Sequence, residues 1–103
     1  MFKEHLKLVR EFKGTIGKRI NIAKMVFFGS RATGGFTKDS DFDILIVSKG
    51  FEGKKSFKRS PELHMLWDFD FPVDILCYTP DEFKRRLKGI NIVSEVMKNG
   101  IVV

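Results

Sequence analysis

Hydrophobic residues recur at helical spacing near the start of the chain and gather in short continuous runs further along. Phe2, Leu6, Val9 and Phe12 alternate with Lys and Glu, which predicts an amphipathic helix. The run Lys24–Phe28 is rich in strand-forming residues and ends at Gly29, so we expect a buried strand there.

Two further apolar runs, residues 41–47 and 73–78, predict the other strands of a sheet. The polar, glycine-bearing stretch 30–40 separates the first two strands. The basic stretch 49–59 is expected to be a mobile connection.

The second half of the chain contains residues that are typical of helix N-termini. Ser60-Pro61 predicts a helix that carries Leu63, Leu66 and Trp67. Thr79 and Glu82 have capping-box spacing, and the helix they begin is expected to end near Gly89. A last short helix, about residues 93–98, stops at Gly100. This order predicts an α/β (α+β) fold, a small mixed β-sheet flanked by helices, in one domain over residues 1–103.

Composition narrows the classes of protein that fit. The 103 residues can form one compact core, and the net charge of +6 favours phosphate-bearing ligands or nucleic acid, although a merely soluble surface has the same charge. The single cysteine, Cys77, excludes an intrachain disulfide and zinc held by cysteine pairs. His5 and His64 are isolated and expected at the surface or its boundary. No apolar run approaches the ~20 residues that span a bilayer, so we expect a cytoplasmic protein.

Three features carry candidate chemistry. Gly29-Ser30 ends a strand, where a glycine backbone and a serine hydroxyl can approach a phosphate. Asp41 and Asp43 lie two residues apart, so in a strand both carboxylates point to one face. Such a pair suits Mg²⁺ or Mn²⁺, although a lone Asp-x-Asp is more often a solvated strand start.

Asp74 is the third carboxylate and lies within an apolar run, where an unpaired charge is costly. It can pair with a Lys or Arg. If its strand lies beside the strand of Asp41 and Asp43, the three carboxylates meet. Such a trio can hold two metal ions ~3.5–4 Å apart for in-line phosphoryl chemistry.

These motifs resemble the signature of the DNA polymerase β-like nucleotidyltransferase superfamily, and most closely its minimal nucleotidyltransferases. The resemblance is carried by the sequences GSRATG at 29–34 and SDFDILIV at 40–47, and the 73–78 strand extends it. It implies that Gly29 and Ser30 bind the β- and γ-phosphates, with Arg31 and Ser40 in the same nucleotide-binding set.

The resemblance also implies catalytic roles for the three carboxylates. Asp41, Asp43 and Asp74 would hold two Mg²⁺ or Mn²⁺ ions, and Asp74 would also help to deprotonate the attacking hydroxyl. The chain departs from the family at Thr33, where relatives usually have Arg before the glycine. Arg31 is then expected to supply positive charge from a different position.

The activity implied is transfer of a nucleoside monophosphate, AMP from ATP, to a hydroxyl. Minimal relatives are often antitoxins encoded beside a HEPN-domain toxin, so the implied acceptor is a hydroxyl on such a partner. The alternatives are a binding module that neutralises a partner by contact, with catalysis weak or lost, and a transferase for small molecules. A chain of this size cannot enclose a large substrate cleft by itself, so a second copy of the chain could also take part, as a homo-oligomer.

Basic groups at residues 54–59 and 84–88 could bind nucleic acid or an acidic partner, or form a solvated face. No stacking platform for bases is evident, so nucleic acid is not favoured. The Walker and dinucleotide-binding glycine motifs are absent from the sequence.

Overall fold

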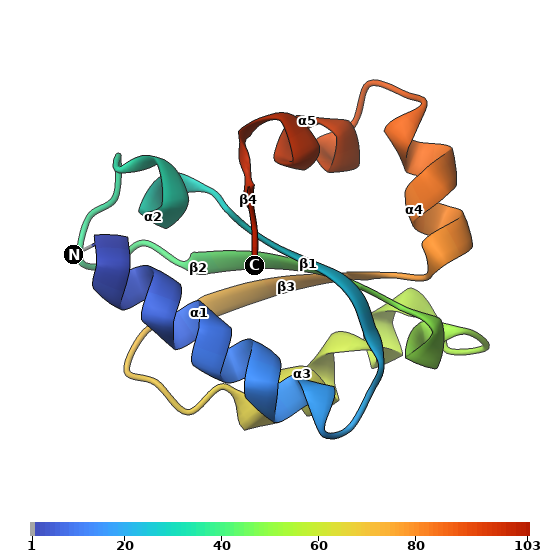
Figure 1. The fold of residues 1–103 in the computed structure, drawn as a ribbon, viewed down its shortest axis with the longest axis horizontal. Helices are drawn as coiled ribbons and strands as arrows, with labels where there is room; N and C mark the ends of the chain where they lie inside the picture. Colours follow the sequence, from blue (N-terminus) through green and yellow to red (C-terminus); the bar gives the residue numbers. More distant parts are fainter. Residues whose placement is uncertain (1) are drawn as a thin grey trace.

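A computed structural model describes residues 2–103 as one four-stranded sheet with helices on both faces (Figure 1). Two short 3₁₀ helices, residues 49–51 and 56–58, lie between β2 and α3. The remaining elements, in chain order, are α1 (Phe2–Gly17), β1 (Ile22–Phe28), α2 (Ser30–Thr33), β2 (Phe42–Ser48), α3 (Ser60–Leu66), β3 (Val73–Tyr78), α4 (Pro80–Leu87), α5 (Ile92–Asn99) and β4 (Ile101–Val102).

The sheet has the strand order β3-β2-β1-β4 and is mixed, as predicted. Strand β1 pairs antiparallel with both β2 and β4, whereas β2 and β3 are parallel. In the parallel pair Phe42 lies opposite Val73 and Val47 opposite Tyr78, without a break in register. The starts of β2 and β3 therefore lie side by side at one end of the sheet.

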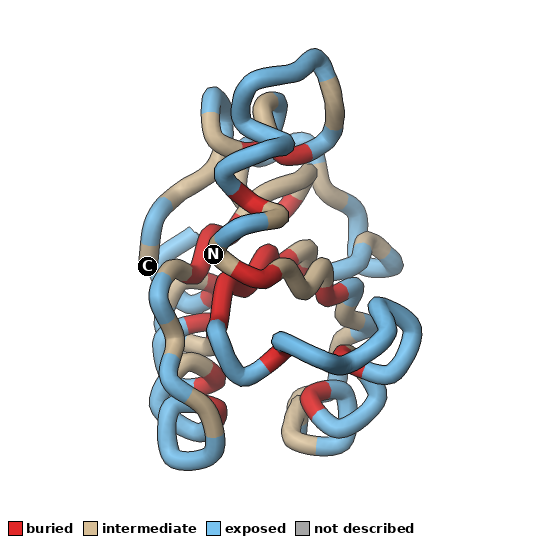
Figure 2. The backbone as a smooth tube through the Cα atoms, turned by 90° about the vertical axis from the view of Figure 1, so that its right-hand side faces the viewer, coloured by how far each residue is buried: buried red, intermediate tan, exposed pale blue. Residues whose placement is uncertain are grey.

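Alternation along the strands divides the core between the two faces of the sheet. Helices α1 and α3 cover one face, where Phe42, Ile44 and Ile46 of β2 are buried. Helices α4 and α5 cover the other face and pack on Leu45 and Val47. Figure 2 shows the buried positions gathered at the sheet and at the inner sides of the helices. A shift of β2 by one residue would turn Asp43 towards the α1 face of the sheet, where the buried side chains are apolar.

The structure extends several of the predicted elements. Helix α1 continues through Gly14 to Gly17, because Ile16 prolongs the buried stripe begun by Val9 and Phe12. Strand β4 and the four-residue helix α2 were not predicted. Both are too short to leave a periodic hydrophobic pattern.

The basic stretch 49–59 is ordered, which corrects the prediction of a mobile connection. Phe51 is buried, and Arg59 is only 7% exposed instead of belonging to a basic surface. The Arg59 guanidinium donates to Glu82 Oε1 at 2.5 Å and Oε2 at 3.1 Å, and also to the carbonyls of Lys54 and Cys77. Glu82 is the capping-box residue of α4, as predicted, so this ion pair ties the stretch to α4.

Replacing Glu82 by Gln should therefore destabilise the protein, because it leaves the buried Arg59 without its counter-ion. Hydrogen bonding from Arg59 lowers the pKa of Glu82 from 4.5 to about 2. Its contribution is present above pH 4.5 and is lost as the pH falls through about 2. At pH 7 we expect Glu82→Gln to lower the unfolding free energy by about 2–3 kcal/mol.

The matched control is Glu62→Gln, since Glu62 is 80% exposed and lies 4.0 Å from Lys54. That exposed pair should contribute little. Urea titrations of both variants at pH 7 and pH 3 measure the difference. Equal stability of the two variants at pH 7 would show that the Arg59–Glu82 pair does not hold this region.

Candidate active site

Asp43 and Asp74 are direct neighbours across the parallel strands β2 and β3. Each follows a residue whose side chain packs into the α1 face, Phe42 and Val73 respectively, so both carboxylates point to the α5 face. Asp41 stands just before β2 and is exposed. Asp74 is exposed too, which corrects the expectation of a carboxylate within a buried run. The structure therefore brings two of the three predicted carboxylates into register and leaves the third immediately beside them.

The electrostatics of this site show uncompensated negative charge. Burial, together with the nearby charges of Asp74 and Asp41, raises the pKa of Asp43 from 3.8 to about 6. No salt bridge to any of the three is present among residues 2–103. A carboxyl group whose pKa is raised by burial and by neighbouring carboxylates is a typical place for a cation to bind.

Gly29 closes the site from the β1 side. Its φ is +81°, and a Cβ built at this position would overlap the Asp43 carboxylate. Phe28 is the register partner of Asp43, so the turn at Gly29–Ser30 passes directly over that side chain. Only glycine allows this approach. A cavity of about 270 Å³ opens next to the turn, between Thr33 and the face of α5 that carries Ile92 and Val96.

The side chains, as they stand, do not form a finished metal centre. Within the described residues no group of three or more His, Cys, Asp or Glu lies close enough to hold a metal ion. Like charges lower their energy by turning apart. The donor set nevertheless fits a hard divalent cation, because Asp41, Asp43 and Asp74 offer only carboxylate oxygens at one sheet end. We name these three as the residues that would hold Mg²⁺ or Mn²⁺.

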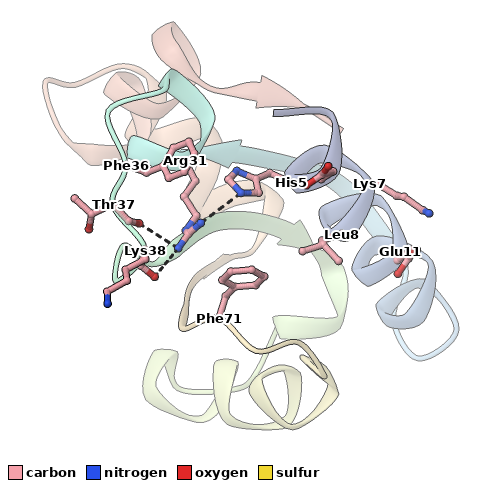
Figure 3. A pocket seen from close by; sticks show the side chains of 10 residues that line it. His5, Lys7, Leu8, Glu11, Arg31, Phe36, Thr37, Lys38 and Phe71 are labelled. Carbon is pink, nitrogen blue, oxygen red and sulfur yellow. Dashed lines mark hydrogen bonds between the residues drawn. The ribbon is translucent and has the colours of Figure 1, made fainter. Parts of the chain in front are cut away.

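Arg31 lies elsewhere than the sequence predicted. Its side chain is 2% exposed and turns to the α1 face, away from the carboxylates. Nε donates to the carbonyl of Ser40 at 2.8 Å, and Nη2 donates to those of Lys38 at 3.1 Å and Thr37 at 3.3 Å (Figure 3). Binding of nucleotide by Arg31 stays a prediction, and in this structure its guanidinium is occupied by these three carbonyls. Arg31 holds the loop that leads into Asp41.

Aromatic rings complete this arginine site. The guanidinium carbon lies 4.8–5.2 Å from the ring centroids of Phe36, Phe42 and Phe71. His5, expected at the surface, is 3% exposed, and its Nε2 lies 3.4 Å from Arg31 Nη1. Burial lowers the pKa of His5, which keeps the imidazole neutral beside the cation. The buried charge is thus stabilised by carbonyls and rings rather than by a carboxylate.

The other predicted nucleotide-binding residues surround the turn. Ser30 is the half-buried first residue of α2, beside Gly29. The Ser40 hydroxyl accepts a hydrogen bond from the Thr37 backbone N–H at 2.9 Å, so it shapes the loop before Asp41. The Thr33 hydroxyl donates to the Gly29 carbonyl at 3.2 Å. Binding of nucleotide by Gly29, Ser30 and Ser40 remains a prediction.

Comparison with known proteins agrees with this geometry. The profile of the family described as "Nucleotidyltransferase domain" matches residues 6–96. The fold also matches a solved structure described as "Crystal structure of a putative nucleotidyltransferase from Sulfolobus solfataricus", with a TM-score of 0.69 and 26% identity. The alignment covers 98% of this chain and 80% of that one. A search of curated proteins finds no match.

The chain therefore belongs to the nucleotidyltransferase domain family, and its fold is the one that the resemblance implied. General nucleotidyl transfer is the activity of this class. Among the described residues, no helix is long and apolar enough to cross a membrane.

Gly29→Ala should damage both the fold and the site. The positive φ is strained for alanine, at a cost of about 1–3 kcal/mol, and the new methyl group displaces the Asp43 carboxylate. Gly35→Ala is the control, because a Cβ there meets nothing within 4 Å and its φ is not positive. Thermal unfolding and Mg²⁺ binding of both variants check this. A Gly29→Ala protein as stable as Gly35→Ala would contradict the close approach.

Asp43→Asn should stabilise the metal-free protein at neutral pH. The folded-state pKa is raised, so the stability linked to protonated Asp43 is present below pH 3.8 and is lost as the pH rises through about 6. After allowance for partial exposure, we expect a gain of about 1–2 kcal/mol at pH 7.5 in EDTA, shrinking to nothing near pH 4.

Asp39→Asn is the control for this variant, since Asp39 is an exposed loop residue before the site. It should leave the pH dependence of unfolding unchanged. Guanidinium titrations across pH 4–8 give the comparison. If Asp43→Asn were less stable than the wild type at pH 7.5, Asp43 would be structural rather than part of a strained cation site.

Proposed function

We propose that this protein is a metal-dependent nucleotidyltransferase that transfers AMP from ATP to a hydroxyl of another protein. The observation that carries the proposal is the register of Asp43 and Asp74 beneath the Gly29 turn. It combines a cation-binding donor set with a backbone turn that a phosphate can approach. The cavity between Thr33 and α5 is where the rest of the nucleotide would extend.

In the reaction that we infer, the acceptor hydroxyl oxygen attacks the α-phosphorus of ATP. The bond from that phosphorus to the bridging oxygen breaks, and pyrophosphate leaves with the electron pair. Bound divalent cations would neutralise phosphate charge and lower the pKa of the hydroxyl. The chain itself orients the phosphates at Gly29 and Ser30 and offers the exposed Asp74 carboxylate as proton acceptor.

The site is open to solvent at Asp74, where the acceptor hydroxyl would arrive, so a large substrate can reach it. β3 is an edge strand, and Asp74 is exposed on it, so the attacking group can arrive from solvent without entering an enclosed pocket. A hydroxyl on a folded partner can reach such a site. We propose a HEPN-type protein encoded beside this chain as that partner, which would give the protein an antitoxin role.

A second function, neutralisation of a partner by contact with weak catalysis, is favoured by one observation. Thr33 replaces the arginine usual in relatives, and Arg31 does not compensate, because it faces the opposite side of the sheet. The phosphate turn therefore has no arginine from this segment. A slow enzyme that mainly binds its partner is consistent with that arrangement.

Calorimetry and mass spectrometry separate these functions. We expect Mg²⁺ to tighten ATP binding at least about tenfold over EDTA, and Asp43→Asn to abolish the difference. Incubation with Mg²⁺, each of the four nucleoside triphosphates and the neighbouring gene product should add AMP to that product. Asp74→Asn should prevent the addition, whereas Asp70→Asn, at an exposed loop position, should not.

The outcomes distinguish the two functions. Tight binding and silencing of the neighbour with no change of mass would establish the contact function. Equal ATP affinity in Mg²⁺ and EDTA would remove the metal-site proposal altogether.

A further inference from the structure

The connection between α4 and α5 exposes an apolar surface that the fold does not use. Leu87 is 42% exposed, Ile90 fully exposed and Ile92 48% exposed, all within six consecutive residues. This corner projects from the body of the molecule (Figure 1), and its chain is largely exposed (Figure 2). Large aliphatic side chains gathered at a protruding turn are typical of an interaction site.

A basic cavity adjoins the same corner. It has a volume of about 430 Å³, and its walls include Arg85 and Arg86 of α4, the ring of Tyr78 and the side chain of Asn91. The guanidinium of Arg86 lies 5.5 Å from the Tyr78 ring centroid, which keeps it folded over the cavity. Asn91 lines this cavity and is the chain neighbour of both Ile90 and Ile92, so the cavity adjoins the apolar residues. The two together are here called the α4–α5 corner.

The positive charge of this cavity is not neutralised within the described residues. The acidic residue that lines the cavity is Glu82, and its carboxylate already accepts hydrogen bonds from Arg59. Neither Arg85 nor Arg86 forms a salt bridge among residues 2–103. Two free guanidinium groups in a concave site attract carboxylate or phosphate oxygens.

The α4–α5 corner is also joined to the candidate active site. Ile92 belongs to the corner and lines the cavity beside Gly29 and Thr33. A molecule seated on the corner therefore lies at the rim of the space where the nucleotide would extend.

We propose that the α4–α5 corner is the docking surface for the acceptor, and that the acceptor is a protein segment carrying both acidic and apolar side chains. This rests on the proposed function. Carboxylates of the acceptor bind Arg85 and Arg86, while its apolar side chains pack on Leu87, Ile90 and Ile92. Docking there holds the target hydroxyl beside the nucleotide.

The chemistry of the corner favours a protein over an RNA. Interfaces between proteins combine exposed apolar residues with arginine, whereas surfaces for nucleic acid are polar and strongly basic. The one aromatic ring in the basic cavity, Tyr78, has the Arg86 guanidinium over it and packs against the core, so stacking on a base would have to displace Arg86.

The test uses synthetic peptides of equal length with one central Tyr. In one peptide Glu alternates with Leu around the Tyr, and in the other Lys replaces each Glu. Fluorescence anisotropy in EDTA, without nucleotide, measures binding independently of catalysis. The acidic peptide should bind the wild-type protein at least about tenfold more tightly than the basic peptide.

Two variants and a matched control locate the binding. Arg85→Gln/Arg86→Gln should weaken binding of the acidic peptide about tenfold, and Ile90→Ser should weaken it severalfold. Lys18→Gln/Arg19→Gln removes the same charge from exposed positions after α1 and should change the affinity less than twofold. Asp43→Asn should bind like the wild type.

Three results would overturn the proposal. The first is an equal loss of affinity in the two double variants, which would mean attraction by net charge alone. The second is equal affinity for the acidic and the basic peptide. The third is that binding of a single-stranded RNA probe, but not of the acidic peptide, depends on Arg85 and Arg86. If the peptide binds as described but ATP and Mg²⁺ leave the hydroxyl of its Tyr unmodified, the docking surface stands and the proposed transfer to a protein hydroxyl fails for this acceptor.

Discussion

The parallel pairing of β2 and β3 is the constraint on which the rest of the site depends. It places Asp43 beside Asp74, and their mutual repulsion cannot be relieved by sliding the strands, because Ile44 to Ile46 are fully buried between two helical layers. The core therefore holds two like charges together at one sheet end. Burial first, and then the charges of Asp74 and Asp41, raise the pKa of Asp43, and a divalent cation is the natural counter-charge.

Two other devices act on the same carboxylates from opposite faces of the sheet. On the α5 side, Gly29 brings the backbone against Asp43 at a position where no side chain fits. On the α1 side, Arg31 donates hydrogen bonds to three backbone carbonyls of the loop that precedes Asp41. Its guanidinium is buried among aromatic rings. Arg31 thus positions an acidic residue from across the sheet without touching it. Gly29 and Arg31 together fix the surroundings of Asp41 and Asp43 in a domain of only 103 residues.

Much of this could be predicted from the sequence, because the informative signals were local. The apolar runs of β1, β2 and β3 and the Thr79–Glu82 capping box follow from spacing alone. The burial of Arg31, Arg59 and His5 could not be predicted in that way. Each is buried by partners distant in sequence, such as Phe71 for Arg31 and Glu82 for Arg59, and a charged residue gives no periodic signal of its own burial. The exposure of Asp74 was missed for the same reason, since an apolar run does not reveal that its strand lies at the sheet edge.

Proton release on metal binding tests the central claim most directly. If a divalent cation binds where Asp43 is held partly protonated by burial and by its neighbours, binding must displace that proton. Titration of Mg²⁺ with ATP at pH 6, in buffers of different ionisation enthalpy, should release about half a proton more than free ATP itself releases on binding Mg²⁺, since the pKa of Asp43 is about 6. This excess release should fall towards zero at pH 8 and vanish in Asp43→Asn. Tight Mg²⁺ binding with no excess proton release at pH 6, or no Mg²⁺ binding at all, would contradict the assignment of this carboxylate edge as the metal site.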